Sequence, residues 1–326
     1  MLILTSCERI NFEEEESGSI HVFESFWYNV DTRFSFFDYI PLDWDSVYNE
    51  YRTKIDESTG QYKLYSILSE MINLLKDGHS NILTTFGTSR YPFSMYFKVN
   101  MLNDISQYFS YYSVLNDVFD YGVLSSNNIG YIKVKTFSNQ VDVQQYEQID
   151  FILNTLINTK SIIIDVRSNG GGSSMNSDII AEKFNDQQRF VLRYREKTGP
   201  EHNDFSEWKD IYLDACNCEI TNKPVAVLTN RWSFSATERF VASMDVIPNV
   251  TIVGDTTGGG SGTPKICELP NGWIIRVSGT QVQLPSGRDY QYTGLYPDIP
   301  VWFLDEDSIN NIDRILETAV NHLYNL

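Results

Sequence analysis

The stretch "SIIIDVRSNGGGSSMNSDIIAEKF" (161–184) places an apolar run, a glycine-rich turn and a helical pattern one after another. The run Ile162, Ile163 and Ile164 is uninterrupted by polar residues, which is typical of a strand buried on both faces. Three glycines follow at 170–172, where the backbone can turn sharply and approach a ligand closely. Strand, turn and helix in this order indicate α/β architecture.

The rest of the chain extends this pattern on both sides. Further strands are predicted in "NIGYIKVKTF" (128–137), "PVAVLTN" (224–230), "VTIVGD" (250–255) and "WIIRVSGTQVQL" (273–284). The tail "SINNIDRILETAVNHLYNL" (308–326) predicts one terminal amphipathic helix. We therefore expect an α/β core over residues 86–326.

Residues 23–85 have a different character and predict a small helical N-terminal domain. Apolar side chains recur at helical spacing in "LYSILSEMINLLKDGHS" (64–80), at Leu64, Ile67, Leu68, Met71, Ile72 and Leu75. Asp77 and Gly78 form a stop signal for that helix. His79 should then lie in the loop that follows.

Composition limits the partners. The 326 residues carry 25 Lys and Arg against 43 Asp and Glu, a net charge of −18 that disfavours nucleic acid and anionic lipid surfaces. The four cysteines, Cys7, Cys216, Cys218 and Cys267, form no C-x-x-C pattern, and only four histidines occur. We therefore expect neither a metal site nor a cofactor. A disulfide joining Cys267 to Cys216 or to Cys218 is left open.

The first seven residues, "MLILTSC", look like the lipobox of bacterial lipoproteins, in which Cys7 would be acylated. The acidic stretch "ERINFEEEESGS" (8–19) would suit a flexible tether. We expect residues 1–22 to form a leader and tether, and the protein to lie in the bacterial cell envelope. A frayed terminus with a chance cysteine is the alternative.

Ser235, in "NRWSFSATERF" (230–240), is the candidate nucleophile. The strand before it and the apolar spacing after it place this serine at or near a helix N-terminus. Unpaired N–H groups and the positive end of the helix dipole would stabilise an oxyanion there. Serine is also a common helix cap, so this feature alone is weak.

Six segments in this order resemble the C-terminal processing (tail-specific) serine peptidase family, in its branch related to the core of tricorn protease. They are "LDWDSVYNEY", "LLKDGHSNI", "IGYIKVKTF", "IIIDVRSNGGG", "VLTNRWSFSATERF" and "GLYPDIPV". The resemblance covers roughly residues 23–303. It implies a crotonase- or ClpP-like α/β spiral core with a helical N-terminal part. Only about forty residues separate "DGHS" from "NIGYIKV", too few for the PDZ domain often inserted in this family.

The resemblance also assigns roles. It makes Ser235 the nucleophile, Ser233 a supporting residue, and His79 the general base. The N–H groups of Gly171 and Ala236 would form the oxyanion hole. Many family members use a lysine base instead, but the equivalent segment here, "TTGGGSG" (256–262), has Gly260 at that position, and Lys265 is out of register.

In the tricorn branch a glutamate orients the base, three positions before the glycine of G-x-x-P-D-I. That position is Gln291 here, in "DYQYTGLYPDI" (289–299). A glutamine can orient a neighbour but brings no charge to stabilise imidazolium. Either the enzyme works slowly with Gln291, or Asp289 has taken over; we favour the slow enzyme.

We therefore predict a serine endopeptidase that acts on peptides or unfolded protein segments through a Ser–His acyl-enzyme mechanism. The alternative is a weak or inactive binding module of the same fold that carries peptide or apolar ligands. The interphotoreceptor retinoid-binding protein shares that core and supports this alternative.

Overall fold

The computed structural model describes residues 18–92, 97, 100–216 and 218–326. Residues 1–17, with Cys7 and most of the predicted leader, lie outside the described residues. The chain forms two compact units, and neither is one continuous stretch of sequence. Unit 1 contains residues 1–91, 199–202 and 264–278, and unit 2 contains residues 92–198, 203–263 and 279–326.

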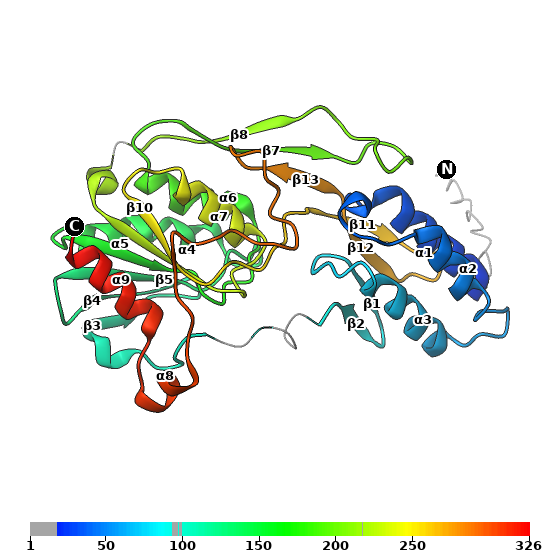
Figure 1. Ribbon diagram of the computed structural model, residues 1–326, viewed down its shortest axis with the longest axis horizontal. Coiled ribbons are helices and arrows are strands. Elements are labelled where there is room, and N and C mark those ends of the chain that lie inside the picture. The colour runs from blue at the N-terminus through cyan, green and yellow to red at the C-terminus, as the bar shows by residue number, and fades with distance from the viewer. Residues whose placement is uncertain (1–17, 93–96, 98–99, 217) are drawn as a thin grey trace, which may run out of the picture. The chain divides into compact units, whose positions relative to one another are not determined.

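In its described residues, unit 1 combines three α-helices with a small antiparallel sheet (Figure 1). The helices are α1 (Ser19–Arg33), α2 (Trp44–Arg52) and α3 (Gln61–Asn73). The sheet has the order β11-β12-β1-β2, with β1 Asn81–Thr84, β2 Gly87–Arg90, β11 Pro264–Glu268 and β12 Ile274–Ser278. The predicted apolar stripe of α3 is buried, although the helix ends at Asn73 rather than at Asp77.

The predicted domain boundary needs correction, because residues 86–326 do not form one unit. Strand β1 begins at Asn81, inside the range expected to be helical, and it pairs with β12, for example Asn81 with Arg276. The expected strand 273–284 is divided at Gly279: β12 belongs to unit 1, whereas β13 (Thr280–Gln283) belongs to unit 2. Local sequence patterns contain no information on which distant strand completes a sheet.

Unit 2 is built on a seven-stranded sheet within the described residues, in the order β14-β10-β9-β6-β5-β4-β3. Strands β5 (Ile129–Val134), β6 (Ser161–Asp165), β9 (Val225–Thr229) and β10 (Val250–Gly254) run parallel to one another. The remaining strands are β3 Phe109–Val114, β4 Phe119–Leu124 and β14 Ile299–Pro300. Every residue of β6 and of β9 is buried, which confirms the prediction from their apolar runs.

Helices cover both faces of this sheet. One apolar core includes residues of α4 (Val143–Glu147), α5 (Ile149–Thr155), α6 (Ser174–Ala181) and α7 (Ala236–Asp245). A second core packs α9 (Arg314–Tyr324) against the opposite face, through Ile315, Leu316, Ala319 and Leu323. A separate three-stranded sheet of unit 2 has the order β13-β7-β8, with β7 Arg189–Glu196 and β8 Lys209–Leu213.

The terminal segment forms two helices, α8 (Asp305–Asn310) and α9, instead of the single predicted one. Asn311 adopts a left-handed conformation with φ of 56°, which ends α8. The side chain of Asp313 then caps α9 by accepting a hydrogen bond from the Leu316 N–H. Asparagine and aspartate are common at such positions, so Asn311 and Asp313 indicate this break in the sequence.

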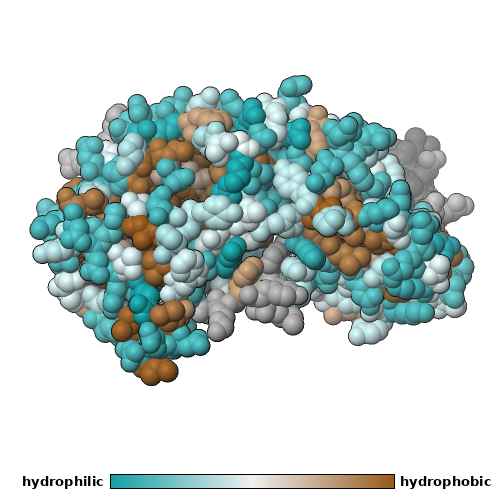
Figure 2. All heavy atoms as spheres, viewed as in Figure 1, coloured by the Kyte–Doolittle hydropathy of each residue, from teal (hydrophilic) through white to brown (hydrophobic). Residues whose placement is uncertain are grey.

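Hydrophilic side chains predominate on the face drawn in Figure 2, as the acidic composition leads one to expect. Among the described helices, none has both the length and the apolar character needed to cross a bilayer.

The disulfide joins Cys216 to Cys218, and Cys267 is a free thiol, so neither pairing left open with Cys267 is formed.

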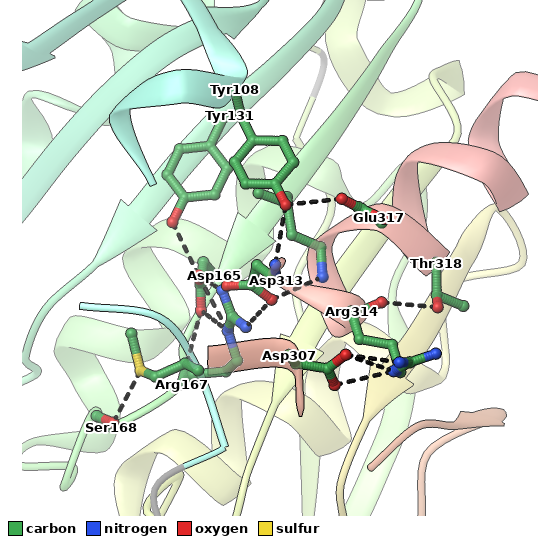
Figure 3. Close-up of polar contacts among 12 residues, drawn as sticks. Tyr108, Tyr131, Asp165, Arg167, Ser168, Asp307, Asp313, Arg314, Glu317 and Thr318 are labelled. Carbon is green, nitrogen blue, oxygen red and sulfur yellow. Dashed lines mark hydrogen bonds and ion pairs between the residues drawn. The ribbon is translucent and has the colours of Figure 1, made fainter. Parts of the chain in front are cut away.

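A fully buried arginine links the end of β6 to the start of α9 (Figure 3). The Arg167 guanidinium lies 2.6 Å from Asp165 and 2.7 Å from Asp313, and all three side chains are inaccessible to solvent. Burial opposes ionisation of Asp165, but the charge of Arg167 and the hydrogen bonds from Arg167 and Tyr131 together outweigh it and lower the pKa of this carboxyl group. The Tyr131 hydroxyl also donates to Asp165, at 2.8 Å.

We predict that Asp313→Ala lowers the free energy of unfolding by about 3–5 kcal/mol, because it removes one of the two ion-pair partners of the buried Arg167 and the side-chain cap of α9. Glu306→Ala is the matched control, since it removes an exposed partner of Arg314 at 3.5 Å. The control should cost less than about 1 kcal/mol. Denaturant titration of both variants measures the difference, and equal losses would contradict the role given to this network.

Candidate active site

Ser235 stands at the junction between β9 and α7. Strand β9 ends at Thr229, residues 230–235 form a turn that we call the nucleophile turn, and α7 begins at Ala236. Ser235 is the residue immediately before that helix, with φ of 62° and ψ of −121°. Glycine is the residue that adopts such angles readily, so a serine here is strained. Strained serines at strand-to-helix turns are a known way to expose a nucleophilic Oγ.

The flanking side chains of this turn are anchored rather than reactive. The Oγ atom of Ser233 is fully buried, donates to the Val166 carbonyl at 2.9 Å and accepts the Asn230 N–H at 3.1 Å. The Thr237 hydroxyl donates to the Asn169 carbonyl at 2.9 Å. Ser233 therefore has structural contacts of the kind expected for the supporting role that the resemblance implies.

The glycine loop, residues 168–172, packs directly against the nucleophile turn. A Cβ atom added to Gly171 would lie 2.9 Å from both the Ser235 Cβ and the Ala236 nitrogen, so no side chain fits there. The structure thus brings Gly171, Ser235 and Ala236 together. In this structure, however, the Gly171 N–H donates to the side-chain oxygen of Asn169 at 3.0 Å.

Asn169 is a functional candidate that the sequence did not reveal. Its side chain is fully buried, and its amide nitrogen donates to the Val134 carbonyl at 3.0 Å. Its side-chain oxygen accepts the Gly171 N–H, which the resemblance assigns to the oxyanion hole. The signal was an asparagine directly before the glycines, but asparagine is common in turns for local reasons.

The position where many relatives would carry a lysine base is closed here. A Cβ atom added to Gly260 would lie 2.2 Å from the ring of Phe234. A lysine at residue 260 would therefore require Phe234 to leave its place. Lys265 lies on β11, in the other unit from Ser235.

Gln291 and Asp289 are held in a dense set of hydrogen bonds. The Gln291 side-chain oxygen accepts the N–H of Ser261 at 2.8 Å, the hydroxyl of Ser261 at 3.2 Å and the N–H of Gly262 at 3.4 Å. These three hydrogen bonds tie the Gln291 side chain to Ser261 and Gly262. Asp289 accepts from the Ser261 hydroxyl and from the N–H groups of Gln291 and Val282.

His79 belongs to unit 1, in the loop between α3 and β1, and is buried. The backbone N–H of His79 donates to the Asp77 carboxylate at 3.3 Å, and the backbone carbonyl of His79 accepts the side-chain amide of Asn81 at 3.0 Å. Burial lowers the pKa of the imidazole, Arg276 lowers it further, and Asp77 acts in the opposite direction. The net effect is a lowered pKa, so His79 is neutral at pH 7 and able to accept a proton.

Asp77 is the second functional candidate that the sequence did not reveal, because it was interpreted only as part of a helix stop signal. Its carboxylate is buried and also accepts the hydroxyls of Ser80 at 2.5 Å and Ser278 at 2.7 Å. These bonds fix the loop that carries His79 onto β12. The only signal was an acid two residues before a histidine at a helix end. Within the described part of the chain, no three His, Cys, Asp or Glu side chains form a group that could hold a metal ion.

Comparison with known sequences gives consistent matches. The model of peptidase family S41 matches residues 128–301, and that of the tricorn protease C1 domain matches residues 21–73. The chloroplastic carboxyl-terminal-processing peptidase 2 of Arabidopsis thaliana is 28% identical over 178 residues. That alignment covers 54% of this chain and 32% of the relative, so the chain spans about a third of that relative's length.

Solved structures support the fold. A candidate peptidase from Parabacteroides merdae is 35% identical, with a TM-score of 0.86, and the match covers 94% of this chain and 97% of that one. The photosystem II D1 C-terminal processing protease has a TM-score of 0.56 at 14% identity, over 94% of this chain and 96% of its own, and shows likeness of fold alone. The expected α/β core with a helical N-terminal region is confirmed.

We predict that His79 titrates below its ordinary pKa of 6.5, because burial disfavours the charged imidazolium. Asp77→Asn should lower the midpoint further, since it removes the charge that favours protonation. The unfolded chain would bind a proton that folded His79 does not, so unfolding free energy should fall as pH drops below 6.5. NMR titration with His79→Gln for assignment measures the midpoint, and a value at or above 6.5 would contradict this account.

Proposed function

The chain belongs to peptidase family S41, and we propose on that basis that it is a serine peptidase with Ser235 as its nucleophile. The observation that carries this proposal is the strained backbone of Ser235, next to the first N–H of α7 and against the glycine loop. Such strain costs about 1–3 kcal/mol and persists where function requires it. A protein that only binds ligands gains nothing from this conformation, so we favour the enzyme over the binding module.

In the proposed mechanism, Ser235 Oγ attacks the carbonyl carbon of a peptide bond and transfers its proton to His79. The carbonyl oxygen gains the negative charge, and the Ala236 N–H at the start of α7 donates to it. Gly171 supplies the second donor, after its N–H leaves the side chain of Asn169. The C–N bond then breaks, the amine leaves with the proton from His79, and water hydrolyses the acyl-enzyme.

His79 suits the role of base because it is neutral at pH 7. When it accepts the proton it becomes imidazolium, which a nearby negative charge stabilises. We propose that Asp77 supplies that charge, since it raises the pKa of His79 and is held in place by two hydroxyls. Gln291 remains the proposed counterpart of the orienting glutamate. Because Gln291 adds no charge to that of Asp77, we expect slower turnover than a glutamate at this position would give.

We further propose that the substrates are peptides or unfolded protein segments. The matched Arabidopsis relative is named as a carboxyl-terminal-processing peptidase, which supports a protein or peptide substrate. A bacterial envelope location and an acylated Cys7 stay part of this proposal. The tether expected over residues 1–22 is shorter than predicted, because α1 begins at Ser19 and buries Val22. Nucleic acids are not expected as partners, because the net charge of −18 repels their phosphate backbones.

Labelling with a fluorophosphonate, read by mass spectrometry of the peptides, tests the nucleophile. We expect the label on Ser235, its loss in Ser235→Ala, and its retention in Ser233→Ala. His79→Ala should slow labelling by about 10²–10⁴-fold, the usual contribution of a positioned base. Label that persists in Ser235→Ala would refute the assignment, and a larger loss in Lys265→Ala than in His79→Ala would favour a lysine base.

We predict that Gln291→Glu accelerates acylation in a single-turnover assay. A glutamate is nearly isosteric, and one carboxylate oxygen can keep the three donors that now hold the Gln291 oxygen. The other oxygen then replaces an amide donor with a negatively charged acceptor, which stabilises imidazolium. Thermal melting of the same variant controls for altered folding. An unchanged or slower acylation rate in a folded variant would contradict the slow-enzyme hypothesis.

A further inference from the structure

We propose that Glu238 is a positioning residue for the nucleophile: its buried carboxylate holds the strained backbone of Ser235 in the reactive conformation. This inference rests on the proposed function, in which Ser235 attacks the substrate. Glu238 touches neither substrate nor base in that mechanism. Its role is to fix the turn from which Ser235 acts.

The carboxylate of Glu238 is fully buried and surrounded by donors. One oxygen accepts the Thr257 hydroxyl at 2.6 Å and the Gly259 N–H at 2.7 Å. The other accepts the Gly260 N–H at 2.8 Å and the Ser235 N–H at 3.0 Å. Three of these donors are backbone N–H groups, which cannot accept a hydrogen bond from a protonated carboxyl group. Burial raises the pKa of Glu238, and the four hydrogen bonds oppose that rise by favouring the ionised form.

The contacts hold Ser235 from both sides. The Ser235 N–H donates to the Glu238 side chain at 3.0 Å, and the Ser235 carbonyl accepts the Glu238 N–H at 2.8 Å. Both peptide groups that flank the Ser235 Cα are therefore fixed by one residue. Because φ and ψ of Ser235 describe rotation about the bonds between those groups, their fixation maintains the angles of 62° and −121°.

The same carboxylate joins the nucleophile turn to the segment 256–262. Gly259 and Gly260 donate to it, and the Phe234 ring packs where a side chain at Gly260 would stand. The Gly258 N–H adds a bond to the Ser233 carbonyl at 2.9 Å. Loss of the carboxylate would release this segment and the Ser235 N–H together.

Glu238→Gln tests the proposal, because it keeps the shape and replaces one acceptor oxygen by an NH₂ group that faces donors. We expect the rate constant of fluorophosphonate acylation at Ser235 to fall roughly 10²-fold, the scale of a nucleophile misplaced by about 1 Å. The concentration for half-saturation of labelling should change less than about twofold, since binding contacts are retained. A merely structural role predicts loss of folded protein without this split.

Asp178→Asn is the matched control. It removes a partly buried carboxylate that contacts Arg239, the residue next to Glu238 on α7, at 3.2 Å. This variant perturbs the packing of α7 but leaves the four donors of Glu238 in place. Its acylation rate should stay within about twofold of the starting protein at equal folded fraction.

A second readout measures the strain itself and needs no activity. Glycine adopts the angles of Ser235 without cost, so Ser235→Gly should melt at a higher temperature than Ser235→Ala. In the Glu238→Gln background the backbone can relax, and the difference between the two melting temperatures should shrink. A difference that is unchanged by Glu238→Gln would overturn the proposal.

The outcomes separate the two hypotheses. Absence of label on Ser235 in the starting protein would refute the proposed function, while the melting comparison would still test Glu238. Label on Ser235 with an equal acylation rate in Glu238→Gln would overturn the inference alone. Should Glu238→Gln fail to fold, Glu238→Asp keeps the charge at a shorter reach: slower acylation at unchanged half-saturation supports the proposal, and an equal rate overturns it.

Discussion

The charge of Arg167 cannot stay buried without partners, and that constraint organises unit 2. Two carboxylates bind it, one at the end of β6 and one at the start of α9. Arg167 directly precedes the glycine loop, which packs against the nucleophile turn. The ion pairs of Arg167 therefore hold the start of the glycine loop in place. The helix at the end of the sequence is thereby connected to the centre of the sheet.

The motif "SFSATE" (233–238) describes how the nucleophile turn is built. Ser233 anchors it to the strand end at Val166, and Thr237 anchors it to the glycine loop. Glu238 binds the segment on its other side. The residue left at the centre of these anchors, Ser235, has the strained angles. A local sequence signal is therefore explained by long-range contacts, each made by a different side chain.

The sequence predicted the buried strands and the location of Ser235, because both depend on neighbours in the chain. It could not predict that β12 pairs with β1, since pairing across nearly two hundred residues leaves no local pattern. The same reason hid Asp77, whose hydroxyl partners include the distant Ser278. The engagement of the Gly171 N–H by Asn169 depends on backbone angles that composition does not reveal.

The discontinuity of unit 1 affects how the protein is made. Its sheet needs β11 and β12, which leave the ribosome long after the three helices and β1. At about 5–20 residues per second, the nascent helical segment waits on the order of ten seconds for these strands. During that interval the edge of β1 that later pairs with β12 is open to other strands. Nascent chains that stall before residue 264 are therefore those most exposed to aggregation and to chaperone binding.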